Sequence, residues 1–261
     1  MNARVSGAVR WFAAIAFAVS VVAPVSVLGP RSVYAQREEP TVDDILNRYI
    51  RALGGKAAIQ KLTSRFGKGT ITITGAGTEG TVQAWLLAPN KLLVVTEFPG
   101  LGTFRQGFDG TLAWSEENDS SLHVVTGPEL EDLRRTADFY RALHMKDVYP
   151  GLTLKDEEEL NGASVWVLET TLPPWTYRMY FDAHTGLMSR FDMERPSEDG
   201  GKTVIVLSPE DYRPVGGVMV PFTLRESSPA VSWVEKFTEI TPNAVTDGSI
   251  FNRPPLPASP K

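Results

Sequence analysis

Cysteine is absent from the 261-residue sequence. This absence excludes a disulfide framework, and it also excludes a metal site built on thiolate ligands. There is likewise no cysteine that could carry a lipid behind an export signal. We therefore expect the mature protein to be soluble rather than a lipoprotein.

Histidine is scarce, since His123, His144 and His184 are the only three. Their spacing matches none of the paired-histidine patterns that hold metal ions. The sequence also lacks a G-x-S-x-G nucleophile elbow. We therefore expect no catalytic, cofactor-binding or metal-binding residue and no cofactor. Each histidine is interpreted as a surface residue or a hydrogen-bonded partner.

Long hydrophobic runs are scarce as well, and the one that stands out lies at the N-terminus. Arg4 and Arg10 precede an uncharged apolar run from Trp11 to Val27, and Val33-Tyr34-Ala35 supplies small residues where a signal peptidase reads. This order is typical of a secretory signal peptide, so we expect cleavage after Ala35 and a periplasmic location. The alternative is an uncleaved membrane anchor. The small residues at the expected cleavage site argue against it.

The mature part has 226 residues (261 minus 35), enough for one domain with a sizeable core. Its net charge is −8, because three of the 26 basic residues leave with the signal peptide while all 31 acidic residues remain. This charge argues against nucleic acid as a partner. The predicted division is a signal peptide over 1–35, a polar linker over 36–40, one folded domain over 41–252 and a disordered, proline-rich tail over 253–261.

Helical signals are few. A capping-box-like pair at Thr41 and Asp44 opens an amphipathic segment that Gly54-Gly55 ends. A second, short helical turn is expected over Lys56 to Leu62. Pro128 at a first helical position, followed by acidic residues and an apolar stripe, predicts a third helix over about Pro128 to Leu143.

The rest of the mature chain alternates apolar and polar residues, which predicts β-strands. Asn161-Gly162 and Gly216-Gly217 are typical of tight hairpin turns, and Asp109-Gly110 of an Asp-led turn. Strands that follow one another with short turns form antiparallel meanders. The expected fold class is mainly β with few helices (α+β), with about eleven strands.

The stretch "FDAHTG" at 181–186 holds an aspartate and a histidine two residues apart, which could belong to a catalytic or metal site. Apolar strand residues enter and leave it, however. Asp182 can accept hydrogen bonds from turn amides, and Gly186 can take the positive φ that closes a hairpin loop. We interpret it as a turn with His184 facing solvent.

The expected sheet is apolar on one face and polar on the other. Tyr177, Met179 and Phe181, for example, alternate with Thr176, Arg178 and Tyr180 of the polar face. About two helices are too few to cover so many strands. The sheet therefore leaves room for a ligand, or closes on itself as a packed barrel. The residues proposed to line an acyl-binding cavity are Ile71, Ile73, Val82, Leu86, Tyr177, Met179, Phe181, Phe191, Phe222, Leu224, Trp233 and Phe237.

Two acidic runs leave a hydrolase open as a further hypothesis. They are Asp156-Glu157-Glu158-Glu159 and the Glu116-Glu117 pair near Asp119. Paired carboxylates can hydrolyse glycosides, but both runs lie beside predicted turns, where solvated charge is ordinary. We therefore expect no enzymatic activity.

Five stretches together resemble the periplasmic outer-membrane lipoprotein-sorting proteins, the LolA/LolB-like carriers. They are "ILNRYIRALGGKAAIQKLTSRFGKGTITI", "KLLVVTEFPGLGTFRQGFDGTLAW", "PELEDLRRTADFYRAL", "YFDAHTGLMSRFDM" and "DYRPVGGVMVPFTLRES". The resemblance covers nearly all of 41–254. It implies an incomplete antiparallel β-barrel whose concave face is covered by helices. The lid-locking arginine of these carriers is not carried over: Arg48 and Arg51 in the first helical segment are candidates, but no motif fixes either.

The function implied by the resemblance is that of a periplasmic carrier for the acyl chains of lipoproteins or other lipids. Its partners would be those acyl chains, an inner-membrane donor protein and an outer-membrane acceptor protein, and the carrier is expected to be a monomer. The acceptor role itself does not fit, because an acceptor of this family carries a lipidated cysteine. The alternative is a lipid-sensing or interaction module of the cell envelope that transports nothing.

Overall fold

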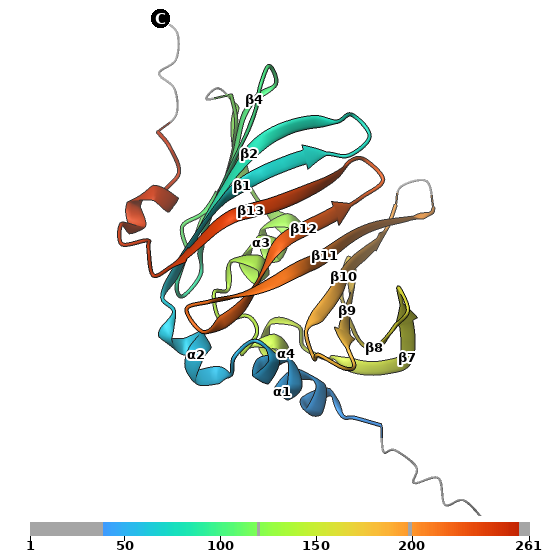
Figure 1. The fold of residues 1–261 in the computed structure, drawn as a ribbon. Helices are drawn as coiled ribbons and strands as arrows, with labels where there is room; N and C mark the ends of the chain where they lie inside the picture. The colour runs from blue at the N-terminus through green and yellow to red at the C-terminus, as the bar shows by residue number, and fades with distance from the viewer. Residues whose placement is uncertain (1–38, 119–120, 198–199, 256–261) are drawn as a thin grey trace, which may run out of the picture. The chain divides into compact units, whose positions relative to one another are not determined.

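The computed structural model of the protein describes residues 39–118, 121–197 and 200–255 (Figure 1). The helices are α1 (Val42–Ala52), α2 (Lys56–Lys61), α3 (Gly127–Ala137), α4 (Met145–Val148) and the 3-10 helix η1 (Gly248–Phe251). The strands are β1 (Ser64–Ile73), β2 (Thr78–Leu87), β3 (Lys91–Phe98), β4 (Gly102–Phe108), β5 (Ala113–Glu117), β6 (Ser121–Val125), β7 (Thr153–Leu160), β8 (Ala163–Leu172), β9 (Trp175–Asp182), β10 (Met188–Pro196), β11 (Lys202–Val215), β12 (Val218–Ser227) and β13 (Ser232–Pro242).

These thirteen strands, two more than expected, form one antiparallel sheet in the order β6-β5-β4-β3-β2-β1-β13-β12-β11-β10-β9-β8-β7. The first and last strands pair at its centre, while β6 and β7 are its two edges. The sheet does not close, so the predicted mainly-β, incomplete barrel is confirmed. Figure 1 shows it wrapping around α3, with α1, α2 and α4 gathered at one end.

The capping box predicted for α1 is present. Asp44 N donates to Thr41 Oγ1 at 3.1 Å, and Thr41 N donates to Asp44 Oδ2 at 3.0 Å, so both free amides are satisfied. Gly54 and Gly55 follow with φ of 114° and 89°, a conformation that ends the helix.

The helix predicted over Pro128 to Leu143 is shorter than expected, because α3 ends at Ala137. Asp138 takes an extended conformation, and its Oδ1 accepts from Tyr140 N at 2.9 Å. Such a local bond from an aspartate to the backbone competes with helix continuation. The apolar stripe beyond it packs as a loop, with Phe139 and Tyr140 beside Leu53 and Leu62.

Both predicted tight hairpins are confirmed. Asn161-Gly162 joins β7 to β8 with φ of 53° and 82°, and Gly216-Gly217 joins β11 to β12 with φ of 59° and 86°. Two successive positive φ values are what a two-residue type I′ hairpin turn requires.

The sheet has an inner face, which the four α-helices contact, and an outer face. On the inner face, β9 and β8 pack against α1 and α4, while β3, β4 and β5 pack against α3. On the outer face, Trp114 and Leu93 are covered by Val245 and by Phe251 of η1. The Trp114 Nε1 donates to Phe251 O at 3.0 Å, which fixes the C-terminal segment there.

One residue of the predicted polar face is buried. Tyr180 was expected on a polar face, yet it is buried on the outer face with Val165 and Val167. Its hydroxyl donates to Asp192 Oδ2 at 3.2 Å, so burial leaves its polar atom satisfied.

The predicted signal peptide lies outside the described residues, as do 256–261 of the predicted tail. Within the described ranges, none of the helices combines the length and apolarity needed to cross a membrane.

Candidate functional site

The twelve residues proposed for an acyl-binding cavity all lie on the inner face. The strand register shows this: Ile71 is opposite Glu235, which is opposite Leu224, and the same alternation continues through Phe191 to Met179. Residues directly opposite one another in adjacent strands share a face. The structure therefore brings together residues that are up to 166 positions apart in sequence (Ile71 to Phe237).

Part of this inner face is closely covered by helices. Tyr177, Met179 and Phe181 of β9 are at most 1% exposed, and they pack against Ile45 of α1 and Met145 of α4, among others. Phe191 borders the same cluster. These four residues form a helix-covered core.

Three further residues of the twelve, Phe222, Phe237 and Leu86, pack against residues in or next to other helices. Phe222 and Phe237 belong to a cluster that includes Leu53 and Ile59, at the ends of α1 and in α2. Leu86 packs with Leu133 of α3. Leu224 is half-buried on β12 between these regions and the far end of the sheet.

The remaining four, Ile71, Ile73, Val82 and Trp233, belong with Phe237 to a cluster whose members all come from strands. Among the described residues, no helical side chain belongs to it. This "strand cluster" consists of Ile71, Ile73, Val82, Val94, Phe98, Phe104, Trp233 and Phe237. Ile71, Val82 and Phe98 are at most 8% exposed, and the other five members are partly exposed. Phe237 and Val94 also pack with the helix-bordered clusters of Ile59 and Leu133. The inner face therefore continues as a partly exposed apolar cluster beyond the helices that cover its other part.

Two carboxyl groups that sequence reasoning missed lie next to this cluster on the inner face. Glu235 is opposite Ile71 and Leu224, and Glu226 is opposite Trp233. Burial raises the pKa of both to about 7, and the charge of Glu235 raises that of Glu226 further. The sequence did contain a pattern that could have identified them as inward-facing. Glu226 follows Leu224 by two residues and Glu235 precedes Phe237 by two, so each shares a face with a predicted cavity residue.

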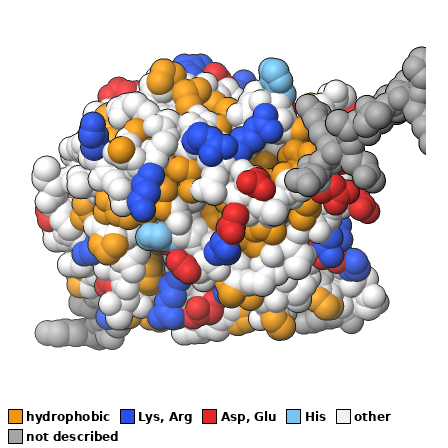
Figure 2. All heavy atoms as spheres, turned by 90° about the horizontal axis from the view of Figure 1, so that it is seen from below, with side chains coloured by type: hydrophobic (Ala, Val, Ile, Leu, Met, Phe, Trp, Pro, Cys, Tyr) orange, Lys and Arg blue, Asp and Glu red, His pale blue; other side chains and the backbone are white. Residues whose placement is uncertain are grey.

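The arginines considered for a helix-locking role do not face the sheet. Arg48 and Arg51 are exposed on α1. Arg48 only reaches the neighbouring turn, where its Nη2 donates to His184 O at 3.4 Å. Figure 2 views the molecule from the end that carries α1, α2 and α4, where side chains of both charges are interspersed with hydrophobic ones.

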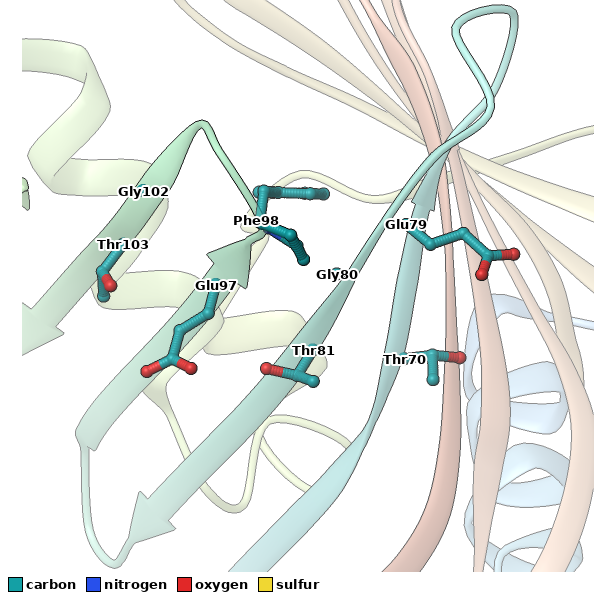
Figure 3. Close-up of a pocket in the computed structure, with 9 residues that line it drawn as sticks. Thr70, Glu79, Gly80, Thr81, Glu97, Phe98, Gly102 and Thr103 are labelled. Carbon is teal, nitrogen blue, oxygen red and sulfur yellow. The ribbon is translucent and has the colours of Figure 1, made fainter.

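A hollow of about 390 Å³ lies at the ends of β1 to β4, but on the outer face (Figure 3). Thr70, Thr81, Glu97 and Thr103 are directly opposite one another on successive strands, with side chains on the face away from Ile71 and Val82. Polar side chains thus line part of this hollow, and Phe98 of the strand cluster borders it as well.

The turn interpretation of "FDAHTG" is confirmed. Asp182 Oδ1 accepts from His184 N at 2.9 Å and from Thr185 N at 2.6 Å, and Gly186 has a φ of 77°. Burial opposes ionisation of Asp182, but these turn hydrogen bonds outweigh it and lower its pKa. His184 is exposed. Asp109 Oδ1 accepts from Thr111 N and Leu112 N at 2.8 Å each, so the second Asp-led turn is built similarly.

The acidic run on β7 lies at a sheet edge, with Glu157, Glu158 and Glu159 exposed. Ser164 Oγ donates to Glu157, an ordinary cross-strand contact. Across 39–118, 121–197 and 200–255, no group of three or more His, Cys, Asp or Glu side chains could hold a metal ion.

Comparison with known proteins shows the fold. No family model and no curated protein matches the sequence. A solved DUF1329 family protein from Desulfovibrio piger has a TM-score of 0.57 and 12% identity, with 82% of this chain and 98% of that chain covered. A LolA superfamily protein from Nitrosomonas europaea has a TM-score of 0.53 and 13% identity, with the same coverage of both chains. The fold is therefore LolA-like, as the sequence resemblance implied.

Proposed function

We propose that this chain is a non-enzymatic periplasmic carrier. It binds the acyl chains of lipoproteins or other lipids on the inner face of its sheet and moves them toward the outer membrane. Its partners are those acyl chains, together with a donor protein at the inner membrane and an acceptor protein at the outer membrane.

The strand cluster is the observation that carries the proposal. Its eight apolar side chains all come from strands, and five of them are partly exposed on the inner face. Burying one methylene contributes about 0.8 kcal/mol, so a sixteen-carbon chain gains on the order of 10 kcal/mol before ordering costs are subtracted. An acyl chain can be held at such a surface without any catalytic group.

The LolA-like fold supports the same proposal, because it places the apolar surface inside an open barrel rather than in a closed core. Of the acidic residues considered for hydrolysis, Glu157, Glu158 and Glu159 are exposed on the edge strand β7, and Glu116 is paired with Arg105 on the outer face of β5. Asp119 lies outside the described residues. The carrier is accordingly proposed to act by binding alone.

Native mass spectrometry of the protein purified from the cell envelope tests the proposal. We expect a mass increment from an acyl-bearing ligand, which is lost on delipidation and restored on incubation with a sixteen-carbon fatty acid. A protein that neither retains nor rebinds any acyl ligand would refute the carrier function. A stable protein partner recovered from envelope extracts without lipid would favour the interaction module instead.

A further inference from the structure

Arg65 lies on the inner face of the sheet, at the end near the helices, and Arg141 is close enough for its charge to act on it. Arg65 is the second residue of β1, directly opposite Leu86 in β2. It precedes Ile71 by six residues, an even number, so its side chain shares the inner face. Arg141 lies in the loop between α3 and α4. Burial, and after it the positive charge of Arg141, lower the pKa of Arg65 to about 10.

The loop that carries Arg141 is held against the start of β1. Tyr140 Oη donates to Leu62 O at 3.0 Å, and Phe139 N donates to Pro89 O at 2.9 Å. Asp138 closes the loop internally, since it accepts from Tyr140 N and also contacts His144 Nδ1 at 2.9 Å. The position of Arg141 next to Arg65 is therefore set by the fold rather than by a free surface side chain.

Other half-buried arginines in this protein have carboxylate partners. Arg105 pairs with Glu116 at 2.9 Å, Arg135 with Asp132 at 3.1 Å and Arg190 with Asp192 at 2.7 Å. Within the described part of the chain, neither Arg65 nor Arg141 forms an ion pair. A half-buried cation without a counter-ion is unfavourable, and a second cation beside it makes it more so.

The groups around the pair cannot neutralise it. Tyr49 lies near both arginines and Tyr149 is hydrogen-bonded to Arg141, but burial raises the pKa of both tyrosines, so each stays uncharged at neutral pH. The carboxylate of Asp132, which also influences Tyr149, is already engaged by Arg135 and by the Tyr177 hydroxyl.

The same tyrosines connect the pair to the apolar inner face. The ring of Tyr49 lies 5.1 Å from that of Phe181, centroid to centroid. The ring of Tyr149 lies 5.2 Å from that of Tyr177 and 5.9 Å from that of Phe191. These rings belong to the helix-covered core. Toward the strand cluster, the next inner-face residue of β1 after Arg65 is Gly67, against which the ring of Phe237 lies. A ligand that reached both the arginine pair and the strand cluster would therefore need one anionic end and an apolar body.

We infer that Arg65 and Arg141 form a binding site for the anionic end of a lipid, a carboxylate or a phosphate, whose acyl chain lies on the inner face toward the strand cluster. Guanidinium groups suit both anions because their planar N–H donors can bind two oxygens at once. This inference rests on the proposed carrier function and specifies the class of lipid.

The inference is tested by measuring the affinity of delipidated protein for three ligands of equal chain length. Palmitate carries a carboxylate, a palmitoyl lysophosphatidic acid carries a phosphate, and methyl palmitate carries no charge. We expect one or both anions to bind about tenfold or more tightly than the neutral ester, as a charge-assisted hydrogen bond would provide. The preferred anion identifies whether a carboxylate or a phosphate is the natural end group.

The variants Arg65→Met and Arg141→Met remove each charge and keep most of the stem. We expect each to lose the preference for anions while binding methyl palmitate as the wild type does. The matched control is Arg225→Met, since Arg225 is exposed on the outer face and pairs with Glu210 at 2.8 Å. This control should keep the full preference.

Thermal unfolding of the ligand-free variants gives a second readout. Because Arg65 has no counter-ion, Arg65→Met should leave the melting temperature unchanged or raise it. A large decrease would show that Arg65 stabilises the fold through a partner, and would overturn the inference. Equal affinity of the wild type for charged and neutral ligands would also overturn it, whereas failure to bind any of the three would contradict the carrier function itself.

Discussion

The helix-covered core and the strand cluster are built from the same inner face of one sheet, yet their surroundings differ. In the core, Phe181 and Met179 are sealed by residues of α1 and α4. In the strand cluster, Ile71 and Trp233 meet only other strands among the described residues. Alternation of apolar and polar residues thus identifies an inner face. Whether a residue on that face stabilises the fold or binds a ligand depends on whether helices cover it.

The largest effect that separates the two regions is expected from truncation of the core. Phe181→Ala should lower the free energy of unfolding by about 3–5 kcal/mol, because it leaves a cavity under α1 and removes the contact with Tyr49. Trp233→Ala in the strand cluster should cost only about 1–2 kcal/mol, because Trp233 is partly exposed. Chemical denaturation of both variants measures the difference.

The two substitutions should have the opposite order of effect on ligand binding, with Trp233→Ala weakening it more than Phe181→Ala. Trp233→Ala is expected to weaken acyl binding at temperatures where both variants are folded. Equal destabilisation by the two substitutions would mean that the strand cluster is ordinary core, and the distinction between the regions would fail.

Sequence reasoning found the inner face because strand alternation and turn chemistry are local. Residues such as Asn161 and Gly216 favour the positive φ that their turns require. Successive strand residues point to opposite faces, so the face of Tyr177 or Phe222 follows from its position along the strand. The segments that pack against each face of the sheet are distant in sequence, however. Nothing local shows that η1 covers Trp114, or that Tyr180 is buried on the outer face.

The charged residues of the inner face were missed for a related reason. Glu226, Glu235 and Arg65 occupy inward positions of their strands, but an isolated charge in an alternating strand is equally compatible with a frayed end or an edge. Only the pairing of β13 with both β1 and β12 places the two glutamates side by side. Likewise, only the loop after α3 brings Arg141 to Arg65.

Glu226 and Glu235 predict that the free energy of unfolding depends on pH, an effect to which the helix-covered core should not contribute. Burial raises the pKa of both to about 7, from 4.5 in the unfolded chain, so the folded state binds their protons more tightly. This contribution to stability is fully present below about pH 4.5 and is lost as the pH rises through about 7. We expect the free energy of unfolding to fall by about 1–3 kcal/mol between pH 5 and pH 8.

Denaturant titrations across that range measure this dependence. The double variant Glu226→Gln, Glu235→Gln should flatten the profile, while Glu210→Gln, at a side chain that is 44% exposed, should keep it. An unchanged profile in the double variant would show that these two carboxyls are solvated rather than buried beside the strand cluster.

A smaller effect is expected in the β9–β10 turn, which meets α1 at the edge of the covered core. Gly186→Val should lower the free energy of unfolding by about 1–2 kcal/mol, because φ is 77° and a Cβ would lie 2.9 Å from Arg48 Cγ. His184→Ala is the matched control and should change stability by less than about 0.5 kcal/mol. If the histidine variant lost function or more stability than the glycine variant, the catalytic interpretation of this turn would return.

The most direct test of the central claim is to locate a bound acyl chain. A sixteen-carbon fatty acid with a photoreactive group near the end of its chain can be cross-linked to the delipidated protein and mapped by peptide mass spectrometry. We predict labelling in β1, β2 and β13, at residues of the strand cluster such as Ile71, Val82 and Trp233, with competition by unlabelled fatty acid. Labelling confined to the outer-face hollow at Thr81 and Glu97, or labelling that unlabelled fatty acid does not suppress, would contradict the account.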